Sequence, residues 1–132
     1  MAASIARLAS EYIENSRSVG IVLELAQVQQ QAMDALRFYA AYGPVASIPG
    51  GAANSAELRT LTEDTVLTVG EWGIVRPLFV LYVERENALH LESAESLGVQ
   101  VYGRRSSEVT QDITQAEELV RFSAFSRPII GV

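Results

Sequence analysis

The chain has 132 residues, of which 48% are hydrophobic and 20% are charged, and its formal net charge is −6 at pH 7. All ten basic residues are arginines, there is neither lysine nor cysteine, and His90 is the only histidine. These absences exclude a Walker A lysine, a Schiff-base amine, a thiolate nucleophile, a disulfide framework and a multi-histidine metal site.

The length and the hydrophobic content predict a single helical domain, residues 1–132, that closes its own core. We expect no secretory signal, because acidic residues interrupt the first apolar stretch. The longest apolar run, 77–83, is far shorter than the roughly 20 residues that cross a bilayer, so we also expect no membrane span. A net-negative domain is a poor ligand for phosphate backbones, which argues against binding to nucleic acid.

Two helices are predicted in the first third of the chain. Residues 4–14 carry apolar side chains at helical spacing after Ser4, which has the chemistry of an N-cap. A second helix is predicted from Val19 to Gly43, where Pro44 bars continuation. Its stripe at i, i+3 and i+4 spacing consists of Ile21, Leu25, Val28, Ala32, Ala35, Leu36 and Tyr39.

The segment 43–60 combines prolines and glycines with no apolar periodicity, so it is predicted to be a long, mobile loop. Loops of this length in small domains are often functional or become ordered on a partner. The other interpretation is that the segment 43–60 is an insertion without a function.

A third helix is predicted from Val69 to Leu97, before Gly98. Thr68 and Glu71 have the spacing of a capping box, in which each side chain accepts a hydrogen bond from the other residue's amide. Residues 78–83 are apolar on every face, so this turn is either buried all round or meets another chain.

The next turn, 84–87, is polar on every side, so some of its side chains share a face with the apolar stripe. Glu84 and Arg85 either reach solvent from a partly buried backbone or form an arginine–carboxylate contact between subunits. Glu86 and His90 lie one turn apart, but carboxylate metal sites in helical bundles need ligands from other helices as well. We therefore expect no metal, no cofactor and no catalytic residue.

After a short predicted strand at 99–102, Ser106 or Ser107 is expected to cap a fourth helix. Its buried stripe would be Val109, Ile113, Ala116 and Val120. An apolar C-terminal tail, 122–132, is expected to follow, and it either pairs with the strand at 99–102 or docks into another subunit. The predicted fold is mainly α: a small bundle of three to four helices with a minor β element and an extended tail.

The stretches 65–72 and 76–88, with the tail at 127–132, resemble in layout the small helical head–tail connector (adaptor, or head-completion) proteins of tailed bacteriophages. The resemblance implies a ring, usually of twelve copies, that binds the portal and the tail or collar proteins. It also implies that DNA passes through the channel without sequence-specific binding, and a place in the virion after assembly in the host cytoplasm. The family has no catalytic residues to carry over.

The leading functional hypothesis is therefore a structural connector that is not an enzyme. The alternative is a small cytosolic regulatory or binding domain that uses a groove between the second and third helices. An enzyme with an acidic active site ranks last. The residues expected at the interface are Glu84, Arg85, Phe122, Phe125, Arg127, Ile129, Ile130 and Val132.

Overall fold

The computed structural model describes residues 3–16, 21, 23–42, 45, 61–95 and 104–126. The expected strand at 99–102, the tail from Arg127 onward and all of the loop at 43–60 except Val45 lie outside these residues. Within them the fold is mainly α, as expected, with four helices and one short two-stranded antiparallel sheet.

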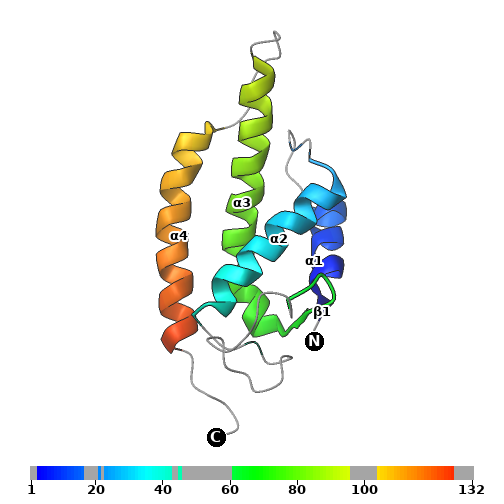
Figure 1. Cartoon of the computed structure of the whole chain (residues 1–132), viewed down its shortest axis with the longest axis vertical. Helices are drawn as coiled ribbons and strands as arrows, with labels where there is room; N and C mark the ends of the chain where they lie inside the picture. The colour runs from blue at the N-terminus through cyan, green and yellow to red at the C-terminus, as the bar shows by residue number, and fades with distance from the viewer. Residues whose placement is uncertain are drawn as a thin grey trace, which may run out of the picture.

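The long helix α3 (Val69–Glu95) is the central element of the bundle. Helix α4 (Ser106–Ser126) runs back along one side of it, and α2 (Leu25–Ala40) crosses in front of it in the view of Figure 1. Helix α1 (Ile5–Glu11) lies beyond α2. Because α3 has more than one neighbouring helix, it needs apolar residues on more than one face. Leu78, Phe79, Tyr82 and Val83 are accordingly buried, whereas Val80 and Leu81 are partly exposed.

The N-terminal helix starts where the sequence predicts. The Ser4 hydroxyl accepts a hydrogen bond from the Arg7 amide at 3.3 Å, which confirms Ser4 as the N-cap. The helix α1 itself is shorter than the expected 4–14, because a π-helical turn at Tyr12–Ser16 replaces its last turn.

The sheet joins the N-terminus to the segment before α3. Strand β1 (Ala3–Ser4) pairs with β2 (Val66–Leu67), and Ala3 lies opposite Leu67. The pairing continues into the first turn of α1, where the Ile5 and Ala6 amides donate to the carbonyls of Thr65 and Glu63 at 3.0 and 2.9 Å. These bonds satisfy amides that a helix leaves free at its start. The minor β element therefore exists, but between segments that the sequence pattern did not indicate.

The second helix is shorter than predicted at both ends. It begins at Leu25 rather than Val19, because the backbone at Glu24 is extended (φ −83°, ψ 166°) and Leu23 is buried from a non-helical segment. The apolar side chain of Leu23 therefore fits the helical sequence pattern although its backbone is not part of the helix. The helix ends at Ala40 rather than at Gly43, in a turn where the Tyr42 amide donates to the Tyr39 carbonyl at 3.0 Å.

The start of α3 agrees with the sequence, but the expected cap of α4 is wrong, because Ser106 is the first residue of that helix and its hydroxyl donates to Glu92. The Thr68 amide donates to Glu71 Oε1 at 2.9 Å and the Glu71 amide donates to the Thr68 hydroxyl at 3.2 Å, which confirms the capping box. In α4, Val109, Ile113 and Val120 are buried, and Ala116 packs beside them. The boundary expected at Arg121 is wrong, because residues 122–126 continue the helix. No proline or glycine lies in this segment to stop it.

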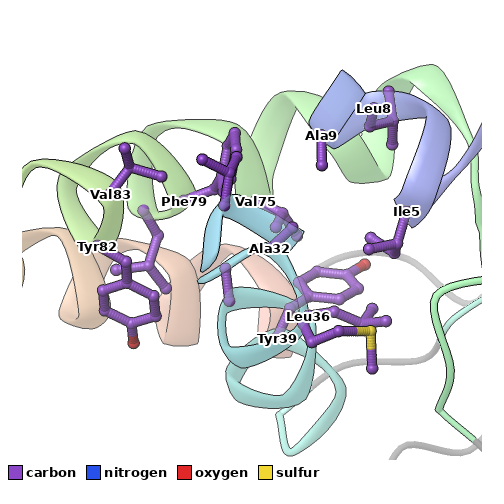
Figure 2. Close-up of a cluster of buried hydrophobic side chains, with 14 of the residues drawn as sticks. Ile5, Leu8, Ala9, Ala32, Leu36, Tyr39, Val75, Phe79, Tyr82 and Val83 are labelled. Carbon is purple, nitrogen blue, oxygen red and sulfur yellow. The ribbon is translucent and has the colours of Figure 1, made fainter. Parts of the chain in front are cut away.

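The core lies where α1, α2 and α3 meet (Figure 2), and α4 adds Val109, Ile113 and Val120 to it. Its largest side chains come from all three helices, and Phe79 of α3 packs edge-on against Tyr12 with ring centroids 5.0 Å apart. Val45 is also buried. Within the described residues, no helix combines the length and the hydropathy that crossing a membrane requires.

Candidate assembly surface

Arg104 links the polar turn of α3, residues 84–87, to α4 through ion pairs. Arg104, just before α4, donates from Nε and Nη2 to the two carboxylate oxygens of Glu84 at 2.7 and 3.2 Å. Its Nη1 also contacts the Asp112 carboxylate. The hydrogen bond from Glu84, and then that from Asp112, raises the pKa of the Arg104 guanidinium, so this side chain stays charged. One cation therefore bridges carboxylates on two helices.

Arg85, the other candidate for a carboxylate contact with another subunit, contacts an aromatic ring of its own helix. Its guanidinium lies over the ring of Tyr82, 5.1 Å from the centroid, which is a cation–π geometry. Within the described part of the chain Arg85 has no ion pair. The arginine–carboxylate pair of the polar turn is formed by Glu84 and Arg104, so an Arg85 contact with another subunit stays a prediction.

Two further polar links join α3 to α4. The phenol of Tyr82 donates to Glu117 Oε2 at 2.6 Å. Burial and then this hydrogen bond raise the pKa of Tyr82 above its ordinary value. Near the far end of α3, the Glu92 carboxylate accepts bonds from the Ser106 amide at 2.7 Å and the Ser106 hydroxyl at 3.1 Å. A carboxylate of α3 thus caps the first turn of α4.

His90 takes part in a contact between helices. Its Nε2 lies 2.9 Å from Gln27 Nε2 of α2 and 3.8 Å from Glu86 Oε1. Among the described residues there is no group of three or more histidine or acidic side chains that could hold a metal ion.

The most exposed large apolar side chains of the described residues lie on α4. Leu119 is 69% exposed and Phe122 is 73% exposed. Residues three apart are neighbours on a helix surface, so the two form one apolar ridge, which we call the α4 outer patch. The exposed residues Gln115 and Glu118 flank it. By helical geometry the patch faces away from the buried stripe that contains Val120.

The orientation of this patch is set by a contact between α4 and α2. The guanidinium of Arg121 lies over the ring of Tyr42, 5.6 Å from its centroid, just beyond the end of α2. The Tyr42 ring in turn packs against Phe38 at 5.2 Å. Arg121 and Val120 therefore hold one side of α4 against the bundle, and Leu119 and Phe122 are left on the other side.

The expected interface residues fall into separate groups. Glu84 and Arg85 lie on α3 beside the start of α4, whereas Phe122 lies near the opposite end of α4. Asp112, which shares Arg104 with Glu84, is about 15 Å from Phe122 along the helix axis, at 1.5 Å per residue. The side chain of Phe125 and the residues Arg127, Ile129, Ile130 and Val132 lie outside the described part.

Sequence reasoning missed Leu119 and Arg104. Leu119 could have been found as an apolar residue off the buried stripe of α4 and one turn before Phe122. Arg104 was visible only as a charge on a turn, and its partners lie 20 and 8 positions away along the chain. A local sequence pattern carries no information about contacts between residues so far apart in the chain.

In comparisons with known proteins, no protein family, no curated protein and no solved structure matches this chain.

Proposed function

We propose that this protein is a structural assembly subunit, specifically a ring-forming connector between the portal and the tail of a tailed bacteriophage. The observation that carries the self-association is the α4 outer patch, in which Leu119 and Phe122 are 69% and 73% exposed. The connector role comes from the resemblance of residues 65–72, 76–88 and 127–132 to that family. A ring of this kind would bind portal and tail or collar proteins and let DNA pass.

The energetics of the patch favour burial against another protein. Removing one leucine or phenylalanine side chain from water contributes about 1.5–3 kcal/mol. A single contact of this size is weak on its own. In a closed ring every subunit makes it with both neighbours, so the contacts reinforce one another.

The use of the polar side chains supports a structural role. Tyr82, Glu84 and Glu92 of α3 all bond to residues in or next to α4, and Arg104 bridges two carboxylates. These groups hold two helices together. The net charge of −6 also suits a channel through which DNA passes without binding, because like charges repel the phosphate backbone.

The mass of the full chain in solution tests the proposal. We expect sedimentation velocity to detect oligomers that grow with concentration, and electron microscopy to show closed rings, with or without a portal protein. Phe122→Asp with Leu119→Asp should weaken the association about 10- to 100-fold and so remove the rings at concentrations where the wild type forms them. The matched control is Val69→Asp, because Val69 is 63% exposed but lies at the start of α3. A monomer under all of these conditions would contradict the proposal, and a monomer that binds a small molecule would favour a binding domain instead.

A further inference from the structure

The α4 outer patch needs an occupant, and the chemistry of this chain points to one. We propose that the patch of one subunit binds the C-terminal residues 129–132 of a neighbouring copy, in a head-to-tail contact. This inference rests on the proposed self-assembly and names the contact that would produce it.

The C-terminal segment carries the complementary apolar groups. Residues 127–132 read Arg-Pro-Ile-Ile-Gly-Val, so three of the six side chains are aliphatic and Arg127 is the one ionisable side chain among them. In an extended segment Ile130 and Val132 would lie on the same side, about 6.6 Å apart at 3.3 Å per residue. Leu119 and Phe122, three apart on a helix, have Cβ atoms about 5–6 Å apart. The two spacings match.

The charges are complementary as well. Glu118 is exposed beside the patch, and Glu108 is exposed on the same side of α4, nearer its start. Arg121, the one described cation near the patch, lies over Tyr42 and also pairs with Glu118 at 3.4 Å. With Glu108, the acidic side chains on this side of α4 still outnumber it, which favours an incoming segment that carries Arg127 over an acidic one.

Length and direction favour a neighbouring copy over the same chain. The tail starts directly after Ser126, where α4 ends, and Leu119 lies about 10 Å back along the helix at 1.5 Å per residue. To reach its own patch the chain would have to reverse at once.

A contact between two different surfaces also has a consequence for symmetry. If two α4 patches paired face to face, the contact would be self-complementary and would stop at a dimer. A tail on a patch leaves one free tail and one free patch at the ends of every open oligomer. Such a contact gives a ring where the rotation between neighbours closes and an open filament where it does not, and the ring is the architecture that the proposed function requires.

Complementation between two full-length variants tests the inference. The patch variant carries Leu119→Asp with Phe122→Asp and keeps its tail, and the tail variant carries Ile130→Asp with Val132→Asp and keeps its patch. We expect each variant alone to associate about 10- to 100-fold more weakly than the wild type, because each loses buried apolar contacts. Mixed in equal amounts they should form a 1:1 heterodimer that does not grow. Circular dichroism checks that both variants fold, and Val69→Asp controls for a charge at an exposed apolar site.

The other possible outcomes distinguish a failure of the head-to-tail contact from a failure of the proposed function. A tail variant that assembles like the wild type would overturn the inference and leave the proposed function standing. An assembling wild type, together with a mixture in which the patch variant leaves the Leu119 and Phe122 resonances of the isotope-labelled tail variant unchanged, would overturn the head-to-tail contact. If the wild type does not assemble, a synthetic peptide of residues 124–132 is added to the isotope-labelled tail variant. Shifts of the Leu119 and Phe122 resonances would then support the contact without the ring, and their absence would overturn it.

Discussion

Arg104 shows what a single side chain contributes to this bundle. It meets both oxygens of Glu84, on the polar turn of α3, and also Asp112 in the second turn of α4. A guanidinium can do this because its donors lie in a planar fork, and a lysine amine cannot reproduce the paired geometry. The polar turn 84–87 is thus a place where an ion-pair network holds α3 to α4.

Replacing Arg104 should therefore lower the stability of the folded chain. We expect Arg104→Ala to reduce the free energy of unfolding by about 0.5–1 kcal/mol, since the pair is half exposed and partly screened by solvent. Arg104→Lys should recover less than half of this loss, and 1 M salt should narrow the difference from wild type. Urea denaturation of the wild type and the two variants, with and without 1 M salt, measures these free energies of unfolding. Arg7→Ala, which breaks the exposed pair with Glu11 within α1, is the matched control and should change little.

Tyr82 gives the fold a pH dependence at the alkaline end. Burial and the bond to Glu117 raise the pKa of its phenol above the usual value near 10, so the folded state holds this proton more tightly than the unfolded state. The resulting stabilisation is complete below about pH 10 and is lost as the pH rises further. Tyr82→Phe lacks the bond, and we expect it to be less stable than wild type by about 1 kcal/mol at pH 7.

The difference in the free energy of unfolding between the wild type and Tyr82→Phe should shrink as the pH rises from 10 to 11. Urea denaturation of both at pH 7, 9, 10 and 11 measures it. Glu117→Gln serves as the second variant, because its amide still accepts the hydrogen bond but carries no charge. A difference that stays constant up to pH 11 would show that the phenol does not hold its proton in the way described.

At the scale of the elements, helix starts are the features with the clearest chemistry. Removing the Glu92 carboxylate, which caps α4 from α3, should cost about 1 kcal/mol, as for other N-caps. We expect Glu92→Ala to accelerate amide hydrogen exchange in the first turn of α4, and Thr68→Ala to do so in the first turn of α3. Glu86→Ala, which removes a partly exposed carboxylate from the middle of α3, is the control. Equal acceleration in both helices for either variant would mean that the effect is global and not one of capping.

The elements that the sequence predicted are those with local signals. The Thr68–Glu71 box lies within one turn, and the Val109, Ile113 and Val120 stripe repeats at helical spacing against polar neighbours. Both could be identified without any knowledge of tertiary structure. The apolar turn 78–83 was expected to be buried all round or to meet another chain; within the single chain Val80 and Leu81 stay partly exposed.

The elements that were missed depend on contacts between distant segments. The β1–β2 pair has only two residues per strand, which is too short for an alternating pattern. The start of α2 was placed too early because Leu23 is buried without being helical. At the candidate surface, Phe122 was identified by its hydrophobicity, but its place on a helix was not, because an exposed helical turn and an apolar tail have the same composition.

At the scale of the whole molecule, folding and assembly should be separable. The described core ends at Val120, so removing residues 127–132 should change the free energy of unfolding by less than about 0.5 kcal/mol. The same deletion should abolish oligomer formation. Thermal denaturation and sedimentation velocity on one preparation measure both effects. Loss of helicity in the truncated chain would place the tail in its own core and contradict this separation.

The pairing of Ala3–Ser4 with Val66–Leu67 has a consequence for the order in which the chain folds. The contacts between α3 and α4 close only a short connection, whereas this pairing closes the entire first half of the chain and carries a larger entropic cost. Contacts between sequence neighbours form faster than those that need long loops to close. The α3–α4 hairpin should therefore form early, and α1 should be the last element to join the bundle and the first to leave it on heating.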